Sequence, residues 1–360
     1  MPMYDVIIIG AGPAGTAAAF DLLGKGLKVL ILDKTQFPRE KACAGGLTPK
    51  AYHLFKYDIS PVIKKECRTI RINSFHNEPF LIRNENPICY MTKRADLDFF
   101  SLKKVIKKGA QFKVVKKIQS IDETDSYVEV QIGSAGFRAS YLIGADGANS
   151  VVRRFVSKTR FYEKQFALEA DVKIDRPDRV QMEFDFSKSR KGYYWIFPKD
   201  DHVNIGIYST DANVRPKTRQ LFEYAEARLQ SRRLTAIKGY PICTGGFNYR
   251  PDSKRILFAG DAAGLSERLL GEGIYFAVKS GQIAAKSILE SEYQKVSAGK
   301  LYLKQLKEIQ TDLRFYHLSS NCLYRLPWMS LKTLSFPFIH KWFAKGYADG
   351  KTLSQILYCQ

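Results

Sequence analysis

The hydrophobic pattern at the start of the chain predicts a strand, a turn, a helix and a second strand within residues 4–34. Residues 6–9 form a short β-branched run, and residues 29–32 supply the second strand. Two short apolar strands joined through a glycine turn and a helix are typical of an α/β fold.

The turn after the first strand carries three glycines at the spacing of a dinucleotide-binding loop. Gly10 permits the tight turn, Gly12 lets the backbone approach a pyrophosphate, and Gly15 lets the helix pack on the strand. The helix N-terminus then directs free N–H groups at phosphate oxygens. A purely structural turn is the alternative, but Asp33 stands where a ribose-binding acid is expected. We interpret the unit as a site for NAD, NADP or FAD.

The glycine-rich segment at residues 37–47 has a composition that suits contact with a bound ligand. Gly45 and Gly46 can lie against a flat ring or a phosphate, and Arg39 can pair with an anion. Cys43 is a proton donor, a redox partner or a packing residue, and the sequence does not decide among the three. An ordinary surface loop is the alternative for the whole segment.

Alternation at residues 68–82 predicts a hairpin, and a helix follows through about residue 108. Arg94 lies near the start of this helix, where its charge opposes the helix dipole unless a ligand anion or a carboxylate offsets it. This conflict favours a ligand role for Arg94. Three strands at residues 111–115, 127–132 and 138–143 are expected to form an antiparallel meander.

The meander leads into a turn at residues 141–154. Gly147 permits this turn, and Asn149 or Ser150 can cap the helix that follows. Asp146 is either a ligand contact or an Asx-turn residue, and both readings stay open. Residues 161–208 are rich in strands.

Three aromatic residues alternate within residues 192–198. A strand would place Tyr193, Trp195 and Phe197 on one face. Such a face walls an apolar pocket or is buried in a core, and the residues alone favour a core.

Another short buried strand at residues 256–260 leads to Asp261, and a helix rich in small residues begins near Gly271 and Gly273. The exposed N–H groups at this helix start predict a second site for an anion or a polarised ring oxygen.

Aromatic and basic residues are interleaved at residues 323–347, within a C-terminal part expected to begin as helix. The mixture suits a membrane interface. A terminal helix packed on the body with snorkelling lysines is the alternative. No recognised nucleic-acid-binding module is present, so we expect no nucleic-acid partner.

The composition favours a globular protein with an anionic partner. The chain has 360 residues, 45% of them hydrophobic, and a formal net charge of +21. The positive charge is compatible with a phospholipid surface, a diphosphate-bearing substrate or nucleic acid as partner. A basic surface without a partner is the alternative. No apolar run of about 18 residues and no signal peptide are found, so we expect a cytoplasmic protein that can attach peripherally to the inner face of the membrane. The six cysteines, Cys359 included, lack CxxC spacing and are expected to be free thiols, with no metal site.

Four ordered segments together resemble the flavoprotein monooxygenase (p-hydroxybenzoate hydroxylase-like) superfamily and its FAD-dependent geranylgeranyl reductase family. They are GAGPAG with Asp33, GADGANSVVRR, GDAAG and GEGI. KACAGGL and the YxWxFP motif ending at Pro198 are similar to the geranylgeranyl reductase branch, in which GxG follows after a short gap. Gly206 stands at the first of these glycines, but Tyr208 replaces the second, which leaves the cavity shape and the substrate open.

The resemblance implies a cofactor site for FAD and a separate substrate wall. The pyrophosphate would be held by Gly10, Gly12, Pro13, Ala14 and Gly15, the ribose by Asp33, and the flavin or its phosphates by Arg39, Cys43, Ala44, Gly45 and Arg94. Asp261 would lie near the ribityl chain or pyrophosphate, Gly271, Gly273 and Ile274 beside the isoalloxazine, and Asp146 and Gly147 in a turn that contacts FAD and helps admit the nicotinamide. Tyr193, Trp195, Phe197, Pro198 and Gly206 would wall the substrate pocket, which reverses the preference for a core. Cys43 and Tyr193 are the candidate proton donors.

The expected fold class is α/β, with a discontinuous Rossmann-like FAD-binding domain at residues 1–60, 91–155 and 255–290. A substrate domain built on an antiparallel β-sheet would occupy residues 61–90 and 156–254, and a helical region residues 291–360.

The expected activity is that of a flavoprotein oxidoreductase of isoprenoid or lipid metabolism, which reduces C=C bonds of a prenyl chain by hydride transfer from reduced flavin. NADPH, NADH or a reduced protein would dock transiently, because the sequence holds only one clear dinucleotide fold. The alternative is a flavin-dependent monooxygenase or halogenase acting on an aromatic substrate. An alternative of another class is a flavin-binding membrane or partner module with little turnover. The oligomeric state is open, and a monomer fits the sequence.

Overall fold

The N-terminal glycine turn follows the first strand of a seven-stranded sheet. The computed structural model describes residues 3–75, 78–156 and 162–358. The sheet has the order β8-β2-β1-β11-β10-β9, with β17 also paired to β11. Its strands are β1 (Met3–Ile9), β2 (Val29–Asp33), β8 (Gln111–Val114), β9 (Ser120–Glu123), β10 (Val128–Ile132), β11 (Ala135–Gly144) and β17 (Ile256–Phe258).

The parallel centre of this sheet is buried on both faces. β1 pairs parallel with β2 and β11, and β11 pairs parallel with β17. Continuous apolar runs suit strands covered on both sides. One cover is formed by α1 (Pro13–Leu23) and α6 (Ile274–Gln294), which touch closely, because a Cβ at Gly281 would lie 2.2 Å from the Ala14 carbonyl oxygen.

The structure corrects the predicted meander. β10 and β11 are antiparallel as expected, but the strand expected at residues 111–115 is β8, which pairs parallel with β2 at the opposite edge. The third strand of the meander is β9, which the sequence pattern did not reveal. β8 is mostly exposed and directly follows the predicted helix α3 (Arg94–Lys107), so its local pattern carries no information about its partner.

A second seven-stranded sheet has the order β16-β12-β15-β14-β13-β5-β6. Its strands are β5 (Thr69–Asn73), β6 (Phe80–Arg83), β12 (Glu163–Val172), β13 (Met182–Asp185), β14 (Gly192–Pro198), β15 (Val203–Ser209) and β16 (Leu234–Thr244). Every pairing in it is antiparallel except that of β13 with β5, and the hairpin of β5 and β6 is confirmed. A small sheet of β3 (Gly46–Leu47), β7 (Cys89–Thr92) and β4 (Ile63–Cys67) was not predicted.

The two faces of the second sheet have different partners. Tyr193, Trp195 and Phe197 share one buried cluster, which confirms that their rings lie on one face of β14. Tyr194 and Ile196 pack on the other face, which is covered by α5 (Thr218–Leu229).

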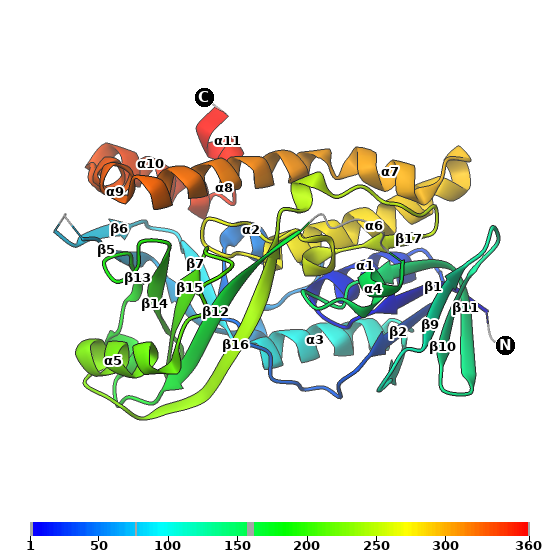
Figure 1. The fold of residues 1–360 in the computed structure, drawn as a ribbon, viewed down its shortest axis with the longest axis horizontal. Helices are drawn as coiled ribbons and strands as arrows, with labels where there is room; N and C mark the ends of the chain where they lie inside the picture. The colour runs from blue at the N-terminus through cyan, green and yellow to red at the C-terminus, as the bar shows by residue number, and fades with distance from the viewer. Residues whose placement is uncertain (1–2, 76–77, 157–161, 359–360) are drawn as a thin grey trace.

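The C-terminal helices lie along one long side of the molecule, over both sheets, and the last of them projects outward from this row (Figure 1). They are α7 (Ala298–Gln305), α8 (Lys307–Arg325), α9 (Pro327–Ser335), α10 (Pro337–Ala348) and α11 (Leu353–Tyr358). Within the described residues, no helix is both long enough and apolar enough to cross a membrane. Five cysteines are free thiols, and Cys359 lies outside the described residues.

Candidate active site

One cavity of about 950 Å³ lies between the glycine turn of the first sheet and the aromatic face of the second. It brings together most of the predicted site residues: Gly10, Gly12, Pro13, Ala14, Asp33, Arg39, Cys43, Ala44, Gly45, Arg94, Asp146, Gly147, Tyr193, Trp195, Phe197, Asp261, Gly271, Gly273 and Ile274. Gly15, Pro198 and Gly206 are predicted site residues that do not line it.

The glycine turn leaves open backbone facing this cavity. Gly10 has a φ of 108°, and a Cβ there would lie 2.3 Å from the Ala145 carbonyl oxygen. A Cβ at Gly15 would lie 1.9 Å from the Gly10 carbonyl oxygen. Gly12 differs, because its Cβ position meets only Arg39 Nη2, at 3.5 Å. Two of the glycines thus build the turn, while Gly12 keeps space free for a ligand.

Asp33 holds the turn while it lines the cavity. Its Oδ2 accepts a hydrogen bond of 2.8 Å from the Ala11 N–H. Its Oδ1 accepts bonds from the N–H and the hydroxyl of Thr35, at 3.0 and 2.8 Å. The carboxylate therefore fixes the relative positions of the ends of β1 and β2.

A carboxylate resolves the charge conflict at the start of α3. Arg94 donates to both oxygens of Asp98 at 3.0 and 2.8 Å, and Arg39 Nη2 lies 3.1 Å from Asp98 Oδ2. Burial acts to lower the pKa of Arg94, but Asp98 outweighs it and the pKa is raised. The conflict therefore no longer argues for a ligand at Arg94. Arg39 Nε is buried without a hydrogen-bond partner among the described residues, so it remains a donor for an anion.

Asp146 serves the turn after β11 in two ways. Its Oδ2 accepts hydrogen bonds from the N–H groups of Val151 and Val152, at 2.6 and 3.3 Å, so it caps α4 (Val151–Val156). Its Oδ1 is buried and has no partner in the described part of the chain. Burial raises the pKa of Asp146. Ser150 also caps α4, as predicted, because its hydroxyl accepts from the Arg153 N–H at 3.0 Å.

The loop before α6 is organised by an acid that the sequence analysis missed. Glu267 accepts hydrogen bonds from the N–H groups of Leu269, Leu270 and Glu272, at 2.5 to 2.9 Å. Burial raises its pKa to about 7. Glu272 in turn pairs with the buried Lys50 at 2.7 Å. No motif marks Glu267, because it acts on its own loop.

Each ring of the aromatic wall is held by its neighbours. The Tyr193 hydroxyl donates to the Leu270 carbonyl at 2.5 Å, and Trp195 Nε1 donates to Asn204 Oδ1 at 2.8 Å. Gly206 lies directly under the Trp195 ring and does not line the cavity. Its missing side chain leaves room for the ring. Tyr208 lines the cavity, with its ring centroid 5.5 Å from that of Tyr193. The residue that departs from the expected GxG pattern therefore occupies space in the cavity.

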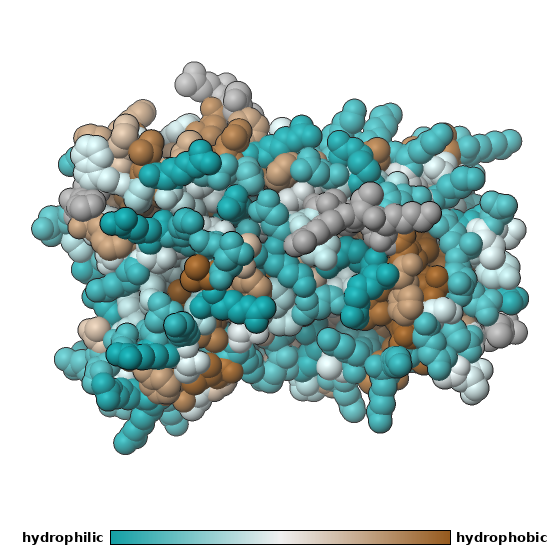
Figure 2. All heavy atoms as spheres, viewed as in Figure 1, coloured by the Kyte–Doolittle hydropathy of each residue, from teal (hydrophilic) through white to brown (hydrophobic). Residues whose placement is uncertain are grey.

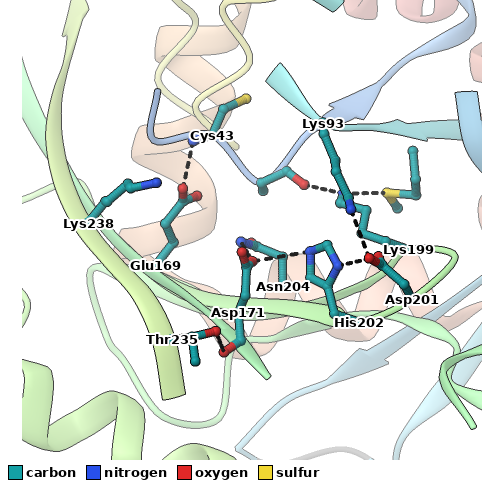
Figure 3. Close-up of polar contacts among 12 residues, drawn as sticks. Cys43, Lys93, Glu169, Asp171, Lys199, Asp201, His202, Asn204, Thr235 and Lys238 are labelled. Atoms are coloured by element: carbon teal, nitrogen blue, oxygen red, sulfur yellow. Dashed lines mark hydrogen bonds and ion pairs between the residues drawn. The ribbon is translucent and has the colours of Figure 1, made fainter. Parts of the chain in front are cut away.

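A second acid that the sequence analysis missed touches the Cys43 loop. Glu169 on β12 accepts a hydrogen bond of 2.9 Å from the Cys43 N–H and lines the cavity (Figure 3). A single glutamate in a strand is usually solvent-exposed, so its sequence context gave no signal.

The polar groups of the cavity suit a dinucleotide with a flat ring. Open space at Gly12, a free buried donor on Arg39 and glycine backbone at Gly45 fit an anionic pyrophosphate and an adjoining ring system. Across the described ranges, no group of three or more His, Cys, Asp or Glu side chains is placed to hold a metal ion.

Comparison of the sequence with known proteins identifies relatives over most of the chain. Residues 4–164 match the family described as pyridine nucleotide-disulphide oxidoreductase. An uncharacterized protein of Methanosarcina barkeri is 39% identical over 81% of this chain and 76% of its own length. The geranylgeranyl diphosphate reductase of Rhodobacter capsulatus is 28% identical over 79% of this chain and 75% of its own. The digeranylgeranylglycerophospholipid reductase of Methanococcus vannielii is 25% identical over 87% and 85%.

Solved structures share the fold over nearly the whole chain. A geranylgeranyl bacteriochlorophyll reductase-like protein from Thermoplasma acidophilum has a TM-score of 0.75 and 22% identity, covering 99% of this chain and 95% of its own. The flavin-dependent brominase Bmp2 has a TM-score of 0.72 and 18% identity, covering 97% and 94%. At these identities the likeness concerns the fold.

Proposed function

Because the chain belongs to the geranylgeranyl reductase family of FAD-dependent oxidoreductases, we propose that it reduces C=C bonds in the prenyl chain of an isoprenoid lipid. The observation that carries this proposal is the continuity of the cavity. The same space that borders Gly12 and Arg39 also borders the aromatic wall of Tyr193, Trp195 and Phe197. An apolar alkene bound against that wall would lie next to the cofactor's ring.

The chain's own residues would bind the cofactor, orient the substrate and exclude water. Gly12, Arg39 and Asp33 would hold the dinucleotide, and Gly45 and Gly271 would lie along its ring. Reduced FAD, when bound, supplies the hydride. The three rings of the wall would keep water from the alkene and fix its position. NADPH, NADH or a reduced protein would deliver electrons transiently, because only one dinucleotide fold is evident in the sequence.

Anaerobic turnover tests this function. The purified protein is loaded with FAD, the flavin is chemically reduced, and prenyl lipids that differ in head group are added. Mass spectrometry then measures the masses of the products. The expected product gains two hydrogens for each bond reduced and forms without oxygen. A hydroxylated or halogenated aromatic product that forms only with oxygen would instead favour a monooxygenase or halogenase. Bound FAD that no donor can reduce would favour a binding module.

An anionic membrane surface is the second part of the proposal. Around α9 and α10, large apolar side chains are exposed, among them Leu326, Trp328, Met329 and Phe336, and Phe338 is 82% exposed. At this end of the molecule, hydrophobic and hydrophilic residues lie side by side on the outer face (Figure 2). Lys332, Lys341 and Lys345 belong to the same two helices. Insertion of the apolar groups, with lysines at the phosphate level, would dock this face on a bilayer.

The docking face lies close to the cavity. Tyr347, on α10, lines the cavity, while Phe338 on the same helix is exposed. A prenyl chain anchored in a bilayer would therefore have a short distance to travel. Salt-dependent co-sedimentation with anionic vesicles tests the docking. Replacing Trp328 and Phe338 by Ser should abolish it, whereas Tyr293→Ser, at an aromatic residue 87% exposed on α6, should not. Equal binding of both variants would contradict the proposal.

A further inference from the structure

Glu169 is an acid enclosed at the junction of the two halves of the site. It lies on β12 opposite Gly206, so no side chain from β15 covers it at that position. Its carboxylate oxygen Oε1 accepts from the Cys43 N–H at 2.9 Å, and the side chain lines the cavity. The residue is only 8% exposed. An acid placed on the aromatic face of the second sheet thus reaches the loop expected to border the flavin.

The backbone beside Glu169 is irregular. The pairing of β12 with β16 shifts register between Glu169 and Asp171, and Ala236 in the facing strand has a φ of 50°. Bulges of this kind re-aim side chains and are frequent next to active sites. A left-handed alanine is uncommon, which marks this as a position where the surroundings impose the conformation.

Three charged side chains and one backbone N–H act on Glu169. Asp171 lies on the same strand, Lys238 on β16, Lys199 after β14, and the Cys43 loop above it (Figure 3). Burial raises the pKa of Glu169 to about 7, although the Cys43 N–H and the two lysines oppose the shift. A carboxyl group with this pKa is available in its protonated form near neutral pH.

Two other proton-bearing groups of the cavity, Tyr193 and Glu267, are engaged with backbone groups. The Tyr193 hydroxyl directs its proton to the Leu270 carbonyl, and burial raises its pKa well above its ordinary value. Glu267 accepts three backbone N–H groups of its own loop. Glu169 accepts one backbone N–H and is the buried acid that contacts the Cys43 loop.

We propose that Glu169 supplies the proton that alkene reduction consumes. This inference rests on the proposed function, since saturation of a C=C bond takes one hydride equivalent and one proton. The O–H bond of the Glu169 carboxylic acid breaks, and a C–H bond forms at the alkene carbon that does not receive the hydride. The carboxylate left behind takes its next proton from water.

Two charged side chains lie between the neighbourhood of Glu169 and the cavity rim. Lys238 is the register partner of Glu169 on β16, and its amino end points toward Glu169 (Figure 3). Lys238 pairs with the exposed Glu40 at 2.6 Å, and both residues line the cavity. Lys238 and Glu40 thus place charged groups beside Glu169 at the side of the cavity where Glu40 is exposed.

Glu169→Gln tests the proton and the hydrogen bond to the Cys43 loop separately. The amide oxygen of Gln can still accept from the Cys43 N–H, but the side chain has no titratable proton. In single-turnover alkene reduction under anaerobic conditions, we expect the wild-type rate to fall as pH rises through about 7. The Gln variant should be slower by about 100-fold or more and independent of pH in that window. Glu169→Asp should keep part of the rate and its pH dependence. Glu163→Gln, at the exposed start of the same strand, should behave as wild type.

A second readout is independent of turnover. Glu267 has a pKa in the same range, so the infrared titration of the holoprotein is done in a Glu267→Gln background. A protonated carboxyl band should disappear there near pH 7, and it should be missing when Glu169→Gln is added. If the Gln variant reduces the alkene at the wild-type rate with the wild-type pH profile, Glu169 is only an anchor and the inference is wrong. If the wild type reduces no prenyl alkene, the proposed function itself fails, and the infrared band shows separately whether Glu169 holds a proton.

Discussion

Gly206 is the position where one added methyl group should disturb the aromatic wall most. A Cβ at this residue would lie 2.0, 2.3 and 2.4 Å from three atoms of the Trp195 ring. The ring has little freedom to retreat, because Nε1 donates to Asn204 and the rings of Tyr193 and Phe197 lie on either side, at centroid distances of 6.1 and 6.2 Å. Gly206→Ala must therefore displace the indole.

The magnitude follows from two contributions. Overpacking in a filled interior costs about 1–3 kcal/mol. Loss of the hydrogen bond from Trp195 to Asn204 adds about 1 kcal/mol. Together they predict a destabilisation of about 2–4 kcal/mol, which corresponds to a fall in Tm of about 3–5 °C for a chain of this size.

Thermal unfolding of the FAD-loaded protein measures this effect. Gly239→Ala is the matched control, since it adds the same methyl group to a strand of the same sheet, where the nearest atom would be Leu168 Cδ1 at an ordinary 3.5 Å. Combining Gly206→Ala with Trp195→Phe should recover part of the loss, because the smaller ring frees the space. A Gly206→Ala protein that melts within about 1 °C of the Gly239→Ala protein would refute the steric reasoning.

Three further predictions follow from single positions. Tyr208→Gly should enlarge the cavity and raise turnover of bulkier prenyl substrates relative to short ones, measured as a ratio of kcat/KM values. Gly12→Val should leave the unfolding of the apoprotein nearly unchanged but abolish FAD retention, seen as loss of the visible flavin spectrum, because its Cβ position meets only Arg39. His202 contacts two aspartates, and although burial acts to lower its pKa, these partners raise it above the ordinary value of 6.5. The protonated His202 therefore stabilises the folded protein fully below pH 6.5, and this stabilisation is lost as pH rises through the raised pKa. His202→Gln should lower the free energy of unfolding more at about pH 6 than at about pH 9. The difference should be less than about 1 kcal/mol, because the group is only half-buried.

Local patterns in the sequence predicted the parts of the site that depend on neighbouring residues. The turn from Gly10 to Gly15, and Asp33 at the end of the next strand, follow from steric rules that act over a few residues. The shared face of Tyr193, Trp195 and Phe197 follows in the same way from strand periodicity.

The remaining features depend on contacts between distant segments. Asp98 could have been proposed as the partner of Arg94 from its spacing of four residues in a helix, but the second partner, Arg39, comes from a separate loop. Glu169 meets the Cys43 loop across 126 positions of the chain, and no local rule predicts such a contact. The same holds for β8, whose partner β2 lies far back in the sequence.

The most direct test of the central claim is the reoxidation of bound, reduced FAD by a prenyl lipid in the absence of oxygen. Stopped-flow absorbance and mass spectrometry of the quenched mixture would be recorded on the same sample. The account predicts that the oxidised flavin spectrum returns and that one C=C bond is saturated for each flavin reoxidised. A flavin that stays reduced until oxygen is admitted, with no saturated lipid formed, would contradict it.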